Sequence, residues 1–117
     1  VHLPKTKETT GLINRDLLLK AKPSLRVINV ARGEVAVEAD VIAALQSGKL
    51  AGAYLDVFEK EPLDPASPLW DLPNVLISPH TASHSQGQNE AIFEIFLENL
   101  ARFREGKSLR NDVDALH

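Results

Sequence analysis

Four side chains in this sequence have types and spacing that suit chemistry on a small acid: Arg32, Asp56, Glu61 and His80. Arg32, Asp56 and His80 each lie at the end of an apolar segment, and 24 residues separate each of them from the next. A guanidinium can hold a carboxylate through paired hydrogen bonds, and a histidine can pass a proton to or from a carbinol oxygen near neutral pH. A carboxylate beside the imidazole, such as that of Glu61, would fix its tautomer. These residues are therefore candidates for one catalytic site.

The segments before these residues are predicted strands, because they are apolar and mostly rich in β-branched residues. The strands cover residues 25–30, 51–57 and 74–78, with a strand remnant at 1–3. Helices are predicted over residues 15–20, 38–46 and 86–104, and Asn14 is a suitable N-cap for the first. Strands that alternate with helices indicate a parallel sheet with helices on both faces. Ligands bind such sheets beyond the carboxyl ends of the strands, where the four candidate side chains are predicted to lie.

The last predicted helix carries an apolar stripe. Its members recur at helical spacing and are Ile92, Phe93, Phe96, Leu97, Leu100 and Phe103. A stripe of this kind is more typical of a packed core than of a cofactor contact. We expect part of it to be exposed in this chain.

The composition is that of an ordinary globular domain. The 117 residues are 44% apolar and 25% charged, with a net charge of -3, which gives no reason to expect a nucleic-acid partner. Apolar runs fall short of the ~20 residues that a membrane span needs. The lack of cysteine fits a reducing compartment, and we expect the cytoplasm. The lack of methionine predicts that the chain is a piece of a longer protein.

Three segments resemble motifs of the D-isomer-specific 2-hydroxyacid dehydrogenases, a family that includes glyoxylate/hydroxypyruvate reductases and D-3-phosphoglycerate dehydrogenases. They read INVARGEV from residue 28, AGAYLDVFEKEPL from residue 51 and NVLISPHTASHS from residue 74. The opening, HLPKTKETTGLIN, resembles the family segment that precedes them. The resemblance implies an α/β fold, namely the second half of a Rossmann-type doubly wound parallel sheet with a long C-terminal helix. It also implies NAD or NADP as cofactor, a small 2-keto or 2-hydroxy acid as substrate, and a homodimer as the full-length form.

The resemblance assigns roles to individual residues. Arg32 matches the arginine that holds the substrate carboxylate, Glu61 the glutamate paired with the catalytic histidine, and His80 the general acid. Asp56 matches the residue that contacts the nicotinamide carboxamide. The full set of implied cofactor-binding residues is Leu3, Pro4, Val30, Ala31, Arg32, Asp56, His80, Thr81, Ala82 and Ser83.

The sequence departs from the family pattern in several places. The glycine-rich fingerprint G-x-G-x-x-G of dinucleotide sites is absent, together with the residue that selects NAD or NADP. Glu34 stands where a second glycine is usual, and Lys5 where an apolar residue is usual. Val37 replaces a usual aspartate, which predicts the loss of a helix N-cap worth about 1 kcal/mol.

Three further expectations concern metal binding, the division of the chain into parts, and the alternatives to catalysis. His80 and His84 have a spacing that metal ligands use, but no third ligand is placed nearby, and no metal is expected. Residues 1–105 are predicted to form the C-terminal half of an NAD(P)-binding domain, and residues 106–117 a tail that leads toward a substrate domain absent from the chain. Two functional alternatives stay open, an NAD(H)-responsive binding module without significant turnover and an inactive fragment.

Overall fold

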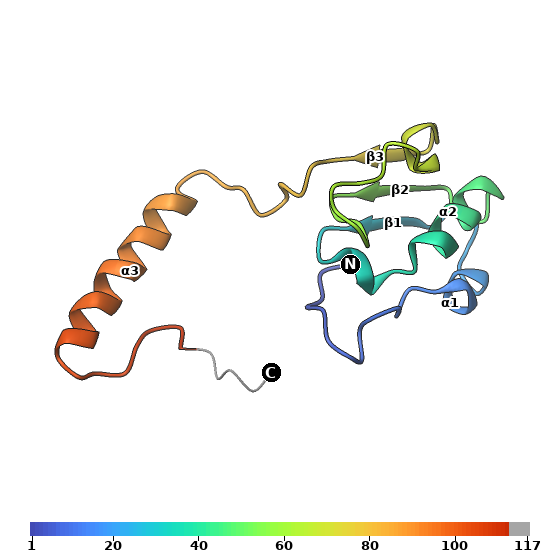
Figure 1. Cartoon of the computed structure of the whole chain (residues 1–117). Coiled ribbons are helices and arrows are strands. Elements are labelled where there is room, and N and C mark those ends of the chain that lie inside the picture. Colours follow the sequence, from blue (N-terminus) through green and yellow to red (C-terminus); the bar gives the residue numbers. More distant parts are fainter. Residues whose placement is uncertain (113–117) are drawn as a thin grey trace. The chain divides into compact units, whose positions relative to one another are not determined.

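The computed structural model describes residues 1–112, which fall into two compact units (Figure 1). The first unit, Val1–Ser83, is a layered α/β structure. The second begins at His84 and is built on one long helix. The part of the predicted tail at 113–117 lies outside the described residues. Because every candidate site residue is in the first unit, that unit positions the site.

A parallel sheet of three strands forms the centre of the first unit. Its strands are β1 (Arg26–Asn29), β2 (Gly52–Leu55) and β3 (Val75–Ile77), in the order β1-β2-β3. Ile28 of β1 lies beside Tyr54 of β2, which in turn lies beside Leu76 of β3. The predicted parallel α/β sheet is thus confirmed, and all three strands end at the same edge.

Two helices precede and follow β1, and their N-termini are held by side chains from other segments. They are α1 (Arg15–Leu19) and α2 (Glu38–Gln46). Asn14 caps α1 as predicted, since its side chain accepts a hydrogen bond from the Leu17 amide at 3.1 Å. Asp40 of α2 also accepts from the Arg15 amide, at 2.8 Å. Two short 3-10 helices complete the unit, η1 (Gly33–Val35) and η2 (Pro68–Trp70).

The core lies between one face of the sheet and the two helices. Its members include Leu18 of α1, Val41, Ala44 and Leu45 of α2, and Val27, Ala53 and Leu55 of the strands. The other face of the sheet presents the row formed by Ile28, Tyr54 and Leu76, where Ile28 is 56% and Leu76 69% exposed. The expected helical cover on both faces is therefore not met within residues 1–83.

The ends of the predicted strands and helices shift by up to two residues in the structure, and two segments differ in kind. Residues 1–3 are not a strand, although Val1 lies alongside β1: its carbonyl accepts from the Val30 amide at 3.4 Å, and its ammonium donates to the Ile28 carbonyl. The predicted loop after β2 contains η2, whose first turn is capped by Ser67. Such a short turn has no apolar periodicity, so the sequence pattern does not reveal it.

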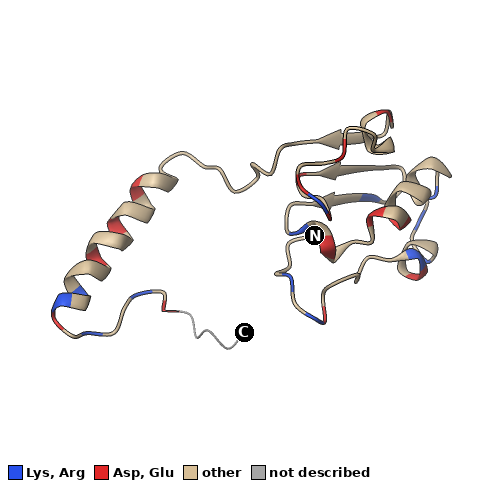
Figure 2. Cartoon of the chain, in the orientation of Figure 1, with Lys and Arg blue, Asp and Glu red and all other residues tan. Residues whose placement is uncertain are grey.

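The second unit consists of α3 (Gln88–Arg104) and the residues around it. Glu90 lies in its first turn and Arg102 and Arg104 in its last, so charges complement the helix dipole at both ends (Figure 2). Residues after the helix fold back on it, since the Asn99 side chain bonds the main chain of Arg110 at 2.9 and 2.7 Å. Within the described part of this unit, no second layer covers the apolar stripe of α3. No helix among residues 1–112 is long and apolar enough to cross a membrane.

Candidate active site

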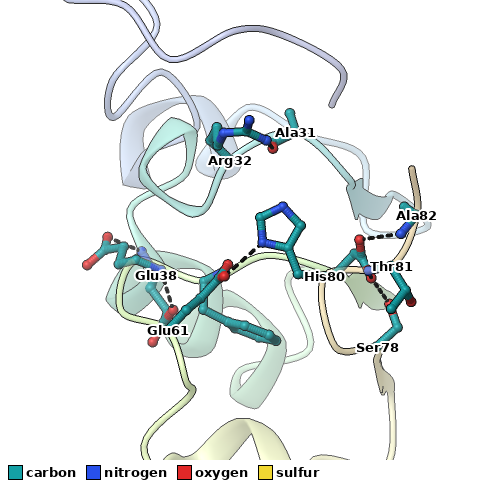
Figure 3. Close-up of polar contacts among 11 residues, drawn as sticks. Ala31, Arg32, Glu38, Glu61, Ser78, His80, Thr81 and Ala82 are labelled. Atoms are coloured by element: carbon teal, nitrogen blue, oxygen red, sulfur yellow. Dashed lines mark hydrogen bonds and ion pairs between the residues drawn. The ribbon is translucent and has the colours of Figure 1, made fainter. Parts of the chain in front are cut away.

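The carboxyl edge of the sheet carries the candidate residues. Asp56 directly follows β2, while Arg32 and His80 lie three residues beyond the ends of β1 and β3. Glu61 lies on the loop that leaves β2. Figure 3 shows the side chains of Arg32, Glu61 and His80 in one region of this edge.

His80 and Glu61 form a direct pair. Nδ1 of His80 lies 2.8 Å from Oε2 of Glu61, and both side chains are part-exposed. The other Glu61 oxygen accepts from the Phe58 amide at 3.1 Å. Burial raises the pKa of Glu61, but the hydrogen bonds from His80 and Phe58 outweigh it, so that the pKa is lowered overall. An ionised carboxylate can accept but not donate, so Nδ1 carries a hydrogen and Nε2 points away from Glu61 (Figure 3).

Asp56 holds the segment that carries His80. Its side chain is buried, and its two oxygens accept from the Thr81 amide at 2.9 Å and the Ala82 amide at 2.8 Å. The Ser78 hydroxyl donates to it as well. Burial raises the pKa of Asp56, and these hydrogen bonds together lower it further than burial raises it. The carboxylate is therefore occupied within the protein, and its contact with a carboxamide stays a prediction.

The main chain at His80 is unusual. Its φ is 54°, in the left-handed region that residues with a Cβ seldom adopt. The two amides that follow His80 are the ones bound by Asp56, so the buried carboxylate holds this conformation in place.

The segment that carries Arg32 is organised by Asn29, which the sequence analysis did not single out. Asn29 is buried; its Oδ1 accepts from the Ala31 amide at 3.2 Å and its Nδ2 donates to the Arg32 carbonyl at 3.1 Å. The Arg32 side chain is exposed, and Nη1 donates to the Ala31 carbonyl at 2.7 Å. The available signal was an amide side chain that directly follows the apolar residues Val27 and Ile28 of the strand.

Gly33 brings the loops after β1 and β2 into contact. A Cβ at this position would lie 1.9 Å from the carbonyl carbon of Phe58, so no side chain fits there. The main chain next to Arg32 thus packs directly on the loop that carries Glu61.

A second link between α2 and this loop uses two glutamates. Glu59 accepts from the Glu38 amide at 2.8 Å, and Glu38 accepts from the Glu59 amide at 3.2 Å. Burial is the main reason that the pKa of Glu38 is raised. The N-cap absent from Val37 is therefore supplied by Glu59, from a distant part of the chain, which corrects the expectation of an uncapped helix.

Two cavities lie at this edge of the sheet. One of about 580 Å³ gathers six predicted cofactor residues, with His2 and Lys5 beside them: Leu3, Pro4, Val30, Ala31, Arg32 and Ser83. The other, of about 270 Å³, includes the predicted residues Asp56, Glu61 and His80 together with Trp70. Arg32 and His80 thus line different cavities. Thr81 and Ala82 line neither of the two cavities, and their amides bind Asp56 instead.

The two family departures Lys5 and Glu34 contact each other. Nζ of Lys5 lies 2.8 Å from Oε1 of Glu34, with 51% and 34% of the side chains exposed. The hydrogen bond from Lys5 is the main reason that the pKa of Glu34 is lowered. Elsewhere, the part of the chain that the structure describes brings no three histidine or acidic side chains together as metal ligands.

Comparisons with known proteins agree with this architecture. Residues 1–82 match the family described as D-isomer specific 2-hydroxyacid dehydrogenase, NAD binding domain. A D-isomer specific 2-hydroxyacid dehydrogenase from Xanthobacter autotrophicus Py2, solved with NADPH and MES, is 47% identical with a TM-score of 0.85. An NADPH-dependent glyoxylate/hydroxypyruvate reductase from Sinorhizobium meliloti, solved with NADP and sulfate, is 42% identical, also with a TM-score of 0.85.

These matches cover most of this chain but a minor part of the relatives. Each of the two solved structures covers 97% of the chain, whereas the chain spans 46% of the Xanthobacter structure and 37% of the Sinorhizobium structure. The fold is that of the Rossmann-type NAD-binding domain, as predicted. The chain belongs to the D-isomer specific 2-hydroxyacid dehydrogenase family, through its NAD-binding domain.

Proposed function

We propose that the protein containing this chain interconverts a small 2-keto acid and its D-2-hydroxy acid with NADPH or NADH. The observation that carries the proposal is the His80–Glu61 pair, 2.8 Å apart at the carboxyl edge of the sheet in a member of this family. Such a pair provides a proton donor or acceptor held in one tautomer.

The chain's residues fit the nicotinamide end of the cofactor. The cavity of about 580 Å³ has small or apolar side chains beside the strand ends, which suit a flat ring and its ribose: Leu3, Pro4, Val30, Ala31 and Ser83. His2, Lys5 and Arg32 add polar groups to its lining. The relatives from Xanthobacter and Sinorhizobium contain NADPH and NADP in their structures. The glycine-rich turn for the pyrophosphate has no counterpart in this sequence. When bound, the cofactor supplies the hydride for the keto carbon.

Three residues of the chain have distinct roles in this proposal. Arg32 holds the substrate carboxylate, because its exposed guanidinium has donors left besides the one that bonds Ala31. Nε2 of His80 delivers a proton to the oxygen during reduction and takes it back during oxidation. Glu61 orients the ring, and its lowered pKa keeps it ionised at neutral pH.

The proposal is tested on the full-length protein with glyoxylate and hydroxypyruvate, each with NADH and NADPH. His80→Gln is expected to lower kcat about 100-fold or more, since general acid catalysis contributes on that scale. Glu61→Gln should lower kcat and change the pH profile, while Arg32→Gln should mainly raise KM. Lys60→Ala, an exposed change next to Glu61, is the matched control. Wild-type turnover by His80→Gln would refute the assignment.

The same assays separate the remaining possibilities. Cofactor binding without turnover of any keto acid would favour an NAD(H)-responsive binding module. We further propose that the isolated 117-residue chain has negligible turnover and that the full-length protein is a cytoplasmic homodimer. Activity of the isolated chain, or a monomeric mass in light scattering, would contradict these expectations.

A further inference from the structure

A line of hydrogen bonds joins the sheet to Asp56. The Tyr54 hydroxyl lies 2.8 Å from Oγ of Ser78, and the Ser78 hydroxyl bonds Asp56. Because the pKa of Asp56 is lowered, its carboxylate is ionised at neutral pH and can only accept. The Ser78 hydrogen therefore points to Asp56, and Ser78 in turn accepts from Tyr54. The direction is fixed from Tyr54 through Ser78 to Asp56.

The end of this line bears on His80 through the main chain. The oxygen that accepts from Ser78 also accepts from the Thr81 amide, and the second oxygen accepts from Ala82. Ser78 and these amides flank His80, whose φ of 54° needs support from its surroundings. Figure 3 shows Ser78, Thr81 and Ala82 grouped beside His80, on the side opposite Glu61.

We propose that Tyr54 and Ser78 are positioning residues, whose hydroxyls hold Asp56 in the orientation that keeps His80 against Glu61. Neither hydroxyl touches the substrate in this scheme. Tyr54 belongs to β2 and lies between Ile28 and Leu76 in the row of side chains on the uncovered sheet face. Its hydroxyl reaches Ser78 at the end of β3 and so connects β2 to the segment that carries His80.

The first test needs no activity. In the full-length protein labelled with 15N-histidine, the His80 ring nitrogens are assigned by their loss in His80→Gln. At a pH alkaline enough to keep the ring neutral, the wild type should show Nδ1 as the hydrogen-bearing nitrogen, and all variants are compared at that pH. In Ser78→Ala and Tyr54→Phe, the Nδ1 and Nε2 shifts should move toward each other as the bond to Glu61 is populated less. Ser78→Thr, which keeps the hydroxyl, should restore the wild-type shifts.

Ser47→Ala is the matched control, because it removes a hydroxyl that bonds the Ala44 carbonyl at the end of α2, away from the site. It should leave the His80 shifts unchanged. Tyr54→Phe keeps the ring and its packing, so it tests the hydroxyl even if Ser78→Ala fails to fold. Wild-type shifts in Tyr54→Phe and in any folded Ser78→Ala would overturn the proposal.

The second test rests on the proposed function. Ser78→Ala should lower kcat about tenfold and Tyr54→Phe about threefold with KM nearly unchanged, because misplacement of a catalytic group reduces turnover more than binding. If the wild type turns over keto acids and these variants match it, the positioning role fails while the function stands. If the nitrogen shifts respond but no keto acid is turned over, the proposed function fails while the positioning role stands.

Discussion

The segments that carry Arg32 and His80 leave the two outer strands of one sheet, yet they are held in different ways. The His80 segment is held by a buried charge, since the Asp56 carboxylate accepts hydrogen bonds from two of its main-chain amides. The Arg32 segment is held by a neutral amide, Asn29, and by the close fit of Gly33 against Phe58. A charged anchor responds to pH, whereas a neutral or steric anchor does not. The two sides of the site should therefore fail under different conditions.

The largest effect is expected from filling the contact on the Arg32 side. Gly33→Ala should lower the free energy of unfolding by about 3 kcal/mol, because the new methyl group would overlap main-chain atoms that cannot rotate away. Urea denaturation measures the loss. Gly48→Ala is the control: it has open space but a left-handed φ of 71°, and should lose about 1 kcal/mol. Equal losses in the two variants would show that the contact with Phe58 does not matter.

Removing the charge of Asp56, which holds the His80 side, should cause the second largest loss of stability. Asp56→Asn replaces a carboxylate oxygen that accepts a hydrogen bond from a main-chain amide with an NH2 group, which cannot accept it. The change should lower the free energy of unfolding by about 2 kcal/mol. The matched change at exposed Asp71, Asp71→Asn, should stay within about 0.5 kcal/mol of the wild type. A loss at Asp56 no larger than that at Asp71 would remove the distinction between the two sides.

The stability contributed by Asp56 should depend on pH, whereas that contributed by the contact of Gly33 should not. Because folding lowers the pKa of Asp56, its charge stabilises the fold fully above the ordinary aspartate value of about 3.9, and that contribution is lost as the pH falls through the lowered pKa. The stability gap between wild type and Asp56→Asn should therefore narrow below about pH 4, while the gap for Gly33→Ala stays constant. Urea midpoints measured from pH 7 down to acid would reveal parallel curves if this assignment were wrong.

The smallest effect is expected from Lys5 and Glu34. Their pair is largely solvent-exposed, so a double-mutant cycle with Lys5→Ala and Glu34→Ala should give a coupling of about 0.5 kcal/mol or less. Salt at about 1 M should remove it. A coupling that survives high salt would place this pair with the buried anchors instead.

The placement of the candidate site residues at the carboxyl edge of the sheet could be predicted from local sequence, for physical reasons. The strand ends follow from apolar segments and regular spacing. The cap at Asn14 could be predicted because the amide that it binds lies only three residues along the chain. The capping of α2 by Glu59 could not be predicted, because the two partners are 21 residues apart and meet only after the loops have packed. The same holds for the bonds from Thr81 and Ala82 to Asp56.

The uncovered sheet face shows the limit of composition as a guide. Ile28 and Leu76 helped to make the strands apolar along nearly their whole length, and this pattern favoured helices on both faces of the sheet. Apolar side chains indicate that a surface favours burial, but they do not indicate which part of a protein covers that surface. Within residues 1–83, the covering helices are on one face alone.

The bonds between Asp56 and the amides of Thr81 and Ala82 have a further consequence for solvent access. Both residues are in irregular chain, yet their N–H groups are tied to a carboxylate that is 1% exposed. Hydrogen exchange with deuterated water requires these bonds to open first. The two amides should therefore exchange as slowly as those in the strands, and an exchange map would count this coil as an extension of the sheet.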